Sequence, residues 1–282
     1  MARSWEGENM DTAGRTLTAR DLQFLVSTLV PERADPQHVV EVLQDDTELL
    51  EAMLQDDKLF QELMHNDDIL LSVSPRFFFQ VLVLRARRDL KKEMYTIERR
   101  NLQKVVLFDA QRVVDLLEQP EVCDYLASML ASYTRIQSTT IPIRVRRGIW
   151  YRLRVNDLDV DSLVRYAQML EKKQRFRAYQ RVGDACLFLA GIFPEHIGAR
   201  QLYSRHSGPQ LRVRSSLLQS LEDYETYGRT FYRLASDQPQ AEVGGLDQVL
   251  ALLAEKFILA EKPLTFIAER YLSLRKHHIF PL

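Results

Sequence analysis

Three Asp-Asp pairs recur every eleven residues near the start of the chain, and regularly spaced carboxylates are one way to hold a cation. The copies are VLQDDTELLEA, MLQDDKLFQEL and MHNDDILLSVS, with the pairs at residues 45–46, 56–57 and 67–68. A calcium loop also needs a glycine at its tight turn and a bidentate glutamate. No copy contains that glycine, so we predict no metal site here.

The same aspartates suit the start of a helix. An aspartate side chain accepts hydrogen bonds from the free N–H groups of a first turn, and its charge complements the positive end of the helix. We therefore expect a series of short helices. An acidic docking surface is one alternative. One continuous helix is another, because an eleven-residue period corresponds to about 3.67 residues per turn.

The sequence motifs of the common enzyme classes are missing. The chain has no phosphate-binding loop ending in Lys-Ser/Thr, no Gly-x-Gly-x-x-Gly, no His-Glu-x-x-His and no Gly-x-Ser-x-Gly. Arg200 and His206 match a spacing that resembles the motif of HEPN-type ribonucleases, where the histidine moves a proton and the arginine holds phosphate. With 29 arginines and six histidines, about two such matches arise by chance and three are found. We assign no catalytic residue, expect no cofactor, and keep this pair only as a candidate for a divergent helical ribonuclease.

Residues 138–156 interrupt an otherwise helical pattern. TIPIRVRRGIWYRLRV alternates apolar and polar residues on both sides of Arg147-Gly148, which predicts a β-hairpin with one apolar face on the helices. Its other face would carry four arginines and a tryptophan, a combination that can bind phosphates and stack on a base. We take this face as the candidate binding surface: Arg144, Arg146, Trp150, Arg152 and Arg154.

Charge is distributed unevenly along the chain. Residues 1–75 carry 5 basic and 16 acidic side chains, a net of −11, whereas residues 76–282 carry 33 and 23, a net of +10. The acidic and basic parts can neutralise each other within the fold or between proteins, or the basic part can attract nucleic acid. We expect the first. An anionic small molecule or a membrane surface is a remaining alternative.

Composition favours a mainly α fold. Hydrophobic residues make up 46% of the chain, glycines and prolines number ten each, and leucine-rich runs outnumber β-branched ones. We expect a bundle of helical hairpins with one inserted two-stranded β-hairpin. The expected organisation is a flexible tail at 1–16, an acidic short-helix segment at 17–75, and a helical domain at 76–282. Within that domain we expect an exposed basic stretch that contains Arg85, Arg87, Arg88, Lys91 and Lys92.

A second internal similarity occurs 45 residues apart. Tyr179 and Gly183 precede one Leu-Ala pair, and Tyr224 and Gly228 precede another. Such a glycine lets a neighbouring helix approach closely, so these four residues are predicted to mediate helix packing. The spacing is similar to that of tetratricopeptide repeats, but the second helix of that repeat is missing.

Together with Tyr125-Leu126-Ala127 and Phe193-Pro194, this pattern resembles a group of uncharacterised bacterial all-helical proteins. The resemblance implies a bacterial origin and a helical fold, and it carries no activity. Cys123 and Cys186 lie in apolar patterns and are expected to be buried thiols, in keeping with a reducing compartment. With no secretory signal or membrane span in the sequence, we expect a cytoplasmic protein with no membrane insertion.

We therefore expect a non-enzymatic scaffold or regulator that acts through a protein partner or as a homo-oligomer. It would use the aromatic-rich helix at 217–235 and the Arg/Trp hairpin. A nucleic-acid-binding regulator that uses the hairpin is the alternative, and the divergent ribonuclease is the third hypothesis.

Overall fold

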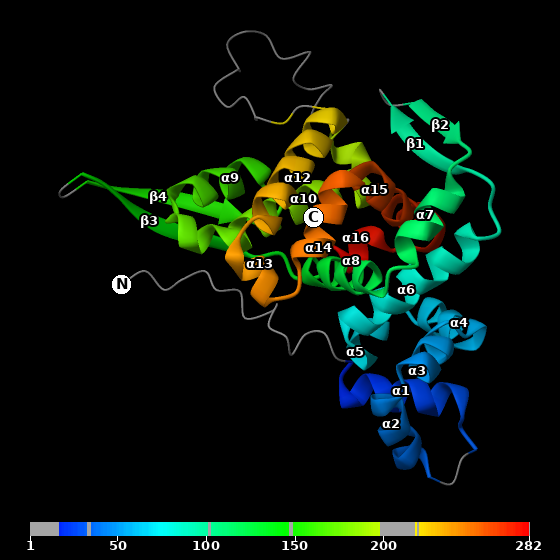
Figure 1. Cartoon of the computed structure of the whole chain (residues 1–282). Coiled ribbons are helices and arrows are strands. Elements are labelled where there is room, and N and C mark those ends of the chain that lie inside the picture. The colour runs from blue at the N-terminus through cyan, green and yellow to red at the C-terminus, as the bar shows by residue number, and fades with distance from the viewer. Residues whose placement is uncertain are drawn as a thin grey trace.

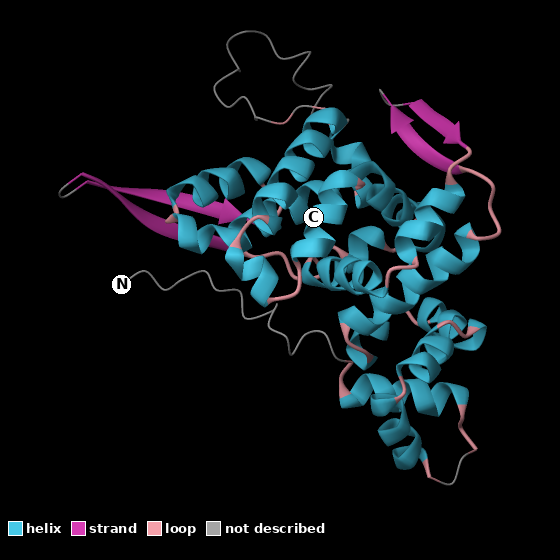
Figure 2. Cartoon of the chain, in the orientation of Figure 1, coloured by secondary structure: helices cyan, strands magenta, loops and turns pink. Residues whose placement is uncertain are grey.

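Helices make up most of the described chain, which confirms the expected mainly α fold (Figure 2). The structure, a computed structural model, describes residues 17–32, 35–100, 103–146, 149–197, 218 and 220–281, without the side chains of 99, 100, 103 and 143–151. The tail expected at 1–16 lies outside these ranges. Among the residues described, no helix combines the length and the apolar character that crossing a bilayer requires.

The acidic segment folds as short helices that start at its aspartates. Asp46 accepts a hydrogen bond from the Leu49 N–H at 2.9 Å, and Asp56 accepts one from the Lys58 N–H at 2.7 Å. Asp68 occupies the same N-cap position without a side-chain hydrogen bond. The expectation of short helices is confirmed, and one continuous helix is excluded. The helices are α1 (Ala19–Leu29), α2 (Pro36–Asp45), α3 (Thr47–Leu54), α4 (Asp57–His65) and α5 (Ile69–Ser72).

These helices pack against α6 (Pro75–Leu90), and ion pairs join the two. Asp57 contacts Arg88 at 2.8 Å and also Arg85, and their hydrogen bonds lower the pKa of Asp57 to about 2. Glu51 pairs with Arg87, whose side chain is 11% exposed. The basic stretch that begins at Arg85 was expected to be exposed. That is confirmed for Lys91 and Lys92 but is wrong for the three arginines, which are half-buried. The reason is that a period of 3.6 residues identifies an apolar face but not the helices that pack beside it.

The remaining helices form a body whose apolar core is continuous with that of α1–α6, and α8, α10, α12, α14 and α15 lie close together in it (Figure 1). Cys123 and Cys186 are both free and buried in it, as expected. The helices are α7 (Ala110–Leu117), α8 (Pro120–Ser132), α9 (Val160–Met169), α10 (Arg175–Ile192), α12 (Leu221–Ser236), α13 (Pro239–Val243), α14 (Asp247–Glu255), α15 (Phe257–Phe266) and α16 (Lys276–Ile279), with a 3₁₀ turn at Lys172–Gln174 and a π-helical turn at Ile267–Tyr271.

Glycines set how closely these helices approach one another. A Cβ added at Gly183 would lie 2.6 Å from the Tyr232 ring, and one added at Gly228 would lie 2.3 Å from the Phe257 ring. No side chain fits at these separations without displacing an aromatic ring of the core. Gly183 therefore allows α10 and α12 to pack together, and Gly228 allows α12 to pack on α15.

Two β-hairpins project from this body on opposite sides (Figure 1). Strands β3 (Ser138–Arg146) and β4 (Ile149–Asn156) form the hairpin that the alternating pattern predicts. Strands β1 (Thr96–Arg100) and β2 (Gln103–Leu107) form a second antiparallel hairpin, which the sequence did not predict. Its strands are only five residues long, and IERR and QK interrupt any apolar alternation.

We expect Gly183→Ala and Gly228→Ala each to lower the free energy of unfolding by about 1–2 kcal/mol. Overpacking costs about 1–3 kcal/mol, and the contacts of 2.6 Å and 2.3 Å place both sites in the upper part of that range, about 2–3 kcal/mol. The better helix propensity of alanine offsets about 1 kcal/mol of that. Gly244→Ala is the control, because its nearest neighbouring atom would lie 3.4 Å from the new Cβ. Urea denaturation followed by circular dichroism measures the effect. Unchanged stability in both core variants would contradict this packing.

Candidate functional site

The hairpin of β3 and β4, which we call the basic arm, is the candidate site. Its two strands pair from Ser138 opposite Asn156 to Arg146 opposite Ile149, with an irregularity between Arg144 and Arg146. Leu153 and Val155 are buried on one face, where β4 lies against α9. Arg152 and Arg154 alternate with them and are exposed on the other face. The period-2 pattern thus places cations toward solvent along a supported ribbon.

A buried ion pair fixes the base of the basic arm. Two guanidinium nitrogens of Arg181 on α10 contact the Asp157 carboxylate, at 3.0 and 3.2 Å. The same carboxylate accepts the Gln137 N–H at 3.0 Å, so both ends of the arm meet at one residue. The Arg181 guanidinium also lies 3.9 Å from the centre of the Tyr133 ring and donates to the Ser132 hydroxyl at 2.7 Å. These contacts orient the arm relative to α8 and α10.

One turn farther along α10, Asp184 forms the centre of a second polar cluster. It accepts hydrogen bonds from the hydroxyls of Tyr125 on α8, at 2.6 Å, and Tyr232 on α12, at 2.9 Å. The Gln180 amide in turn donates to the Tyr125 hydroxyl at 3.2 Å. Burial raises the pKa of Asp184 from 3.8 to about 6, although these hydrogen bonds and nearby Arg181 favour the ionised form. The cluster connects α8, α10 and α12.

Positive charge extends from the arm onto the residues that precede and follow it in the sequence. Residues 135–177 hold eleven basic and four acidic side chains, a net of +7. Within the residues that the structure describes, five exposed cations of this region have no acidic partner. They are Arg135, Arg152, Arg165, Lys172 and Lys173. Arg154, also exposed, donates to the Ser138 hydroxyl at 3.0 Å and not to a carboxylate.

The arginines of α6 and Arg275 behave differently from these cations. The arginines of α6 are paired with the acidic segment, and Arg275 lies 3.4 Å from Asp67. The acidic segment thus finds its cations on α6 and near the C-terminal end of the chain. The expected neutralisation within the fold does occur, and among the described side chains it involves α6 and Arg275 and not Arg152 or Arg154 of the arm. Within the described residues, the five exposed cations of the arm region have no such carboxylate partner.

The remaining predicted residues fall into two groups. Gly183, Tyr224 and Gly228 are buried, and the Tyr179 ring packs edge to face on Phe231, with ring centres 5.6 Å apart. The side chains of Arg144, Arg146 and Trp150 lie outside the described residues, although their backbone is in the arm. Arg200 and His206 also lie outside the described residues.

The aromatic-rich helix expected to serve as an interaction surface corresponds to α12. Its Tyr224, Phe231 and Tyr232 are buried in the core, so their aromatic rings are not available to a partner. The rings follow the three-to-four spacing of a helix face that packs inward, which alone does not distinguish a core face from a docking face. The expectation of an aromatic binding helix is therefore wrong for these three residues.

Sequence reasoning overlooked the Arg181–Asp157 pair and the cations that follow the arm. Composition over 135–177 was the signal for the latter, since the basic excess continues past the alternating pattern. Comparison with protein-family models, with curated proteins and with solved structures finds no match for this chain. The functional conclusion therefore rests on the geometry and charge described above.

Titration of Asp184 predicts a specific dependence of stability on pH. Between the unfolded pKa of 3.8 and the folded pKa of about 6, the folded protein holds a proton that the unfolded chain has lost. The stabilisation that this proton gives to the folded state is complete below the unfolded pKa and is lost as pH rises through the folded pKa. Asp184→Asn removes this titration, so the free energy of unfolding of the wild type relative to the variant should fall by about 2–3 kcal/mol over that window. Urea denaturation at several pH values measures the difference, and parallel curves would contradict the assignment.

Proposed function

We propose that the protein is a non-enzymatic helical scaffold or regulator that works by binding, and that its basic arm binds nucleic acid. The observation that carries this proposal is the set of exposed cations in the arm region without acidic partners among the described residues. Charged side chains that a fold uses internally are paired, as those of α6 are. Unpaired cations gathered on and around one projecting ribbon favour an anionic partner.

The spacing of the arm suits a phosphate backbone. Arg152 and Arg154 stand two residues apart on one strand, a separation of about 6.8 Å. A stacked strand carries one phosphate for about every 3.4 Å of helix axis, so two arginines at this spacing can each reach a phosphate of the same strand. A two-stranded ribbon is also one of the elements that proteins lay into a groove of duplex DNA. Recognition would be electrostatic, with affinity that falls as salt rises.

An acidic protein would satisfy the same cations, and it remains the main competitor. It differs from nucleic acid in presenting carboxylates on flexible side chains in place of a regular line of phosphates. Polyglutamate of matched charge therefore serves as a second probe. Tighter binding of polyglutamate than of an oligonucleotide would overturn the proposal in favour of an acidic protein partner.

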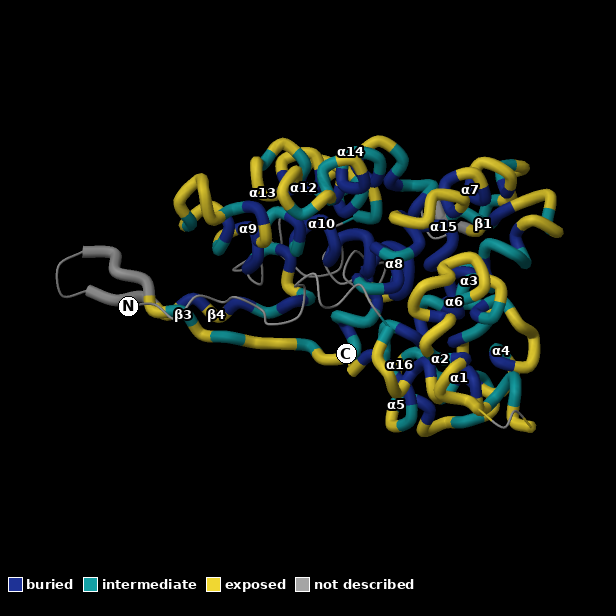
Figure 3. The backbone as a smooth tube through the Cα atoms, turned by 60° about the horizontal axis from the view of Figure 1, so that its bottom comes forward, coloured by how far each residue is buried: buried dark blue, intermediate teal, exposed yellow. Residues whose placement is uncertain are grey.

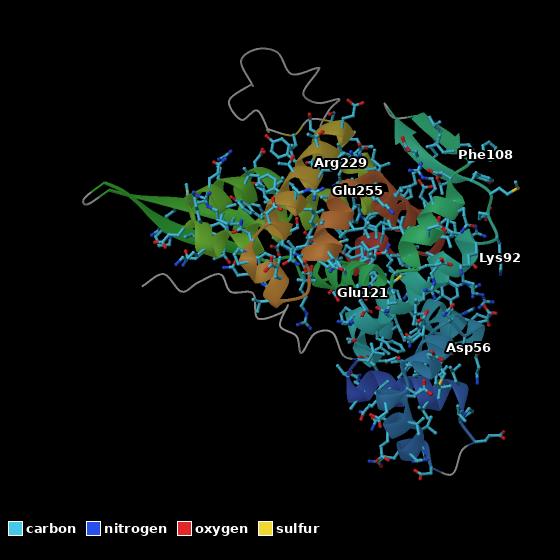
Figure 4. All side chains as sticks on the ribbon, in the orientation of Figure 1. Asp56, Lys92, Phe108, Glu121, Arg229 and Glu255 are labelled. Carbon is cyan, nitrogen blue, oxygen red and sulfur yellow. The ribbon has the colours of Figure 1, made fainter. Side chains whose placement is uncertain are left out.

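The test is fluorescence anisotropy of labelled single- and double-stranded oligonucleotides, titrated with the full chain at low and physiological salt. We expect Arg152→Ala/Arg154→Ala to weaken binding at low salt by roughly ten-fold or more and to reduce the salt slope by about 2, one for each lost phosphate contact. The matched control is Arg229→Ala/Arg233→Ala, which removes two exposed charges from α12. Arg229 lies on α12, away from the arm (Figure 4).

The control should bind like the wild type, because it lowers the net charge equally without altering the arm. No binding at low salt by the wild type would overturn the proposal. Equal losses in the arm variant and the control would assign the effect to net charge alone and would remove the arm as the site.

A further inference from the structure

The second hairpin gathers exposed apolar side chains. Phe108 is 80% exposed, Met94 78%, Val106 52% and Tyr95 43%, all within fifteen residues that form or flank β1 and β2. Figure 4 shows Phe108 beside β2, pointing away from the helices. Together these side chains expose roughly 450 Å² of mostly apolar surface, within the range of the largest patches on monomeric proteins, which are often functional.

The hairpin also has an unused backbone edge. β1 lies on the side of α15, and within the described residues no strand pairs with the outer edge of β2. A two-stranded sheet is only marginally stable in water, and it gains most from additional strands. Exposure along β2 alternates: Lys104, Val106 and Phe108 are exposed, whereas Val105 and Leu107 are half-buried. An added strand would therefore find both free backbone groups and an apolar face beside them.

The usual protection against edge pairing is weak here. A lysine on an edge strand normally discourages association by keeping a charge at the edge. In β2 the ammonium of Lys104 instead pairs with Glu269 of the π-helical turn, at 3.0 Å. β3 offers the opposite case, because Pro142 in its middle removes a backbone donor and the arm carries several arginines. Of the two hairpins, the β1–β2 hairpin is thus the one suited to pairing.

These features fit a second copy of the same chain. A two-fold axis brings identical strands together antiparallel, so two β2 strands would join two hairpins into one four-stranded sheet. Val106 and Phe108 of both copies would then lie over the joined sheet. The only charge on β2 is already neutralised, so the pairing brings no uncompensated like charges together. Two patches of this size total roughly 900 Å² before backbone contacts are added, close to the lower limit of about 1,000 Å² for a specific interface.

We propose that the protein forms a homodimer in which the outer edges of two β2 strands pair, with Val106 and Phe108 at the interface. This inference is independent of the proposed nucleic-acid binding, since it rests on a surface at the opposite side of the body. The two views in Figures 1 and 3 both place β1 and the basic arm at opposite ends. A dimer would carry two arms on the far sides of the joined sheet.

Sedimentation velocity of the full chain over a range of concentrations tests the proposal. We expect the wild type to sediment as a dimer at micromolar concentrations, and Val106→Thr/Phe108→Ser to raise the dimer dissociation constant at least 30-fold. Threonine retains the β-propensity of residue 106, and both side chains are exposed, so the fold should persist. Circular dichroism and the melting temperature verify this. The matched control is Val243→Ser/Leu274→Ser, which removes two apolar side chains that are 92% and 97% exposed elsewhere.

A wild type that is monomeric at roughly 100 µM would overturn the inference, because the edge of β2 would then pair with another partner or with none. A dimer that persists in Val106→Thr/Phe108→Ser would also overturn it, by placing the interface elsewhere. As a positive test, Val106→Glu and Val106→Lys chains should each be monomeric alone and should associate when mixed. Failure of the mixture to associate, when each charge variant alone is monomeric and folded, would contradict pairing between two β2 strands.

Discussion

The buried ion pair between Arg181 and Asp157 is the constraint on which the basic arm depends. A two-stranded ribbon has no core of its own, so its direction must be set where it joins the body. Here one carboxylate receives two contacts from Arg181 and the backbone N–H of Gln137, which precedes β3. Removing either charged partner would leave the other buried and uncompensated, at a cost of about 3–5 kcal/mol. The arm is thus presented by the helical core and is not a free loop.

The Asp184 cluster extends this constraint into the body. Gly183 and Asp184 are neighbours on α10. The glycine lets α12 approach closely, and the aspartate accepts one hydrogen bond from a tyrosine hydroxyl of α8 and another from a tyrosine hydroxyl of α12. Close packing and hydrogen bonding therefore act on the same turn of α10. This turn directly follows the turn of α10 that contains Arg181. The contacts that pack the helices of the core therefore also fix the orientation of the arm. Burying a carboxyl there costs stability at neutral pH, and the two hydroxyls offset part of that cost.

The two hairpins have contrasting surfaces, and we propose different partners for them. The basic arm has exposed cations and a proline in one strand, features that keep strand edges from pairing and attract anions. The β1–β2 hairpin exposes apolar side chains, and its lysine is bound to a neighbouring glutamate. These surfaces lie on opposite sides of the body, so the two proposed interactions would not obstruct each other. If both operate, two linked arms would bind a polymer more tightly than one arm, through effective concentration.

The mainly α fold, the short acidic helices and the basic arm could all be predicted from the sequence. Each depends on local information: leucine periodicity, an aspartate before a helix, and strict alternation around Arg147-Gly148. The pairing of Arg181 with Asp157, 24 residues apart, could not be predicted, because periodicity gives a residue's face and not its neighbour. For the same reason, neither the pairing of Arg87 with Glu51 nor the burial of the aromatic rings of α12 could be predicted. The β1–β2 hairpin was missed because five-residue strands with charged residues give no clear period.

The central claim is that the basic arm is the surface to which a nucleic acid binds. Hydrogen–deuterium exchange of the full chain, with and without a saturating oligonucleotide, tests it most directly because it reports where binding slows exchange. We predict slower exchange in residues 138–165, which cover the arm and the start of α9, with α2, α3 and α4 unchanged. Slower exchange confined to the acidic helices or the β1–β2 hairpin, with the arm unaffected under conditions where the oligonucleotide is bound, would contradict it.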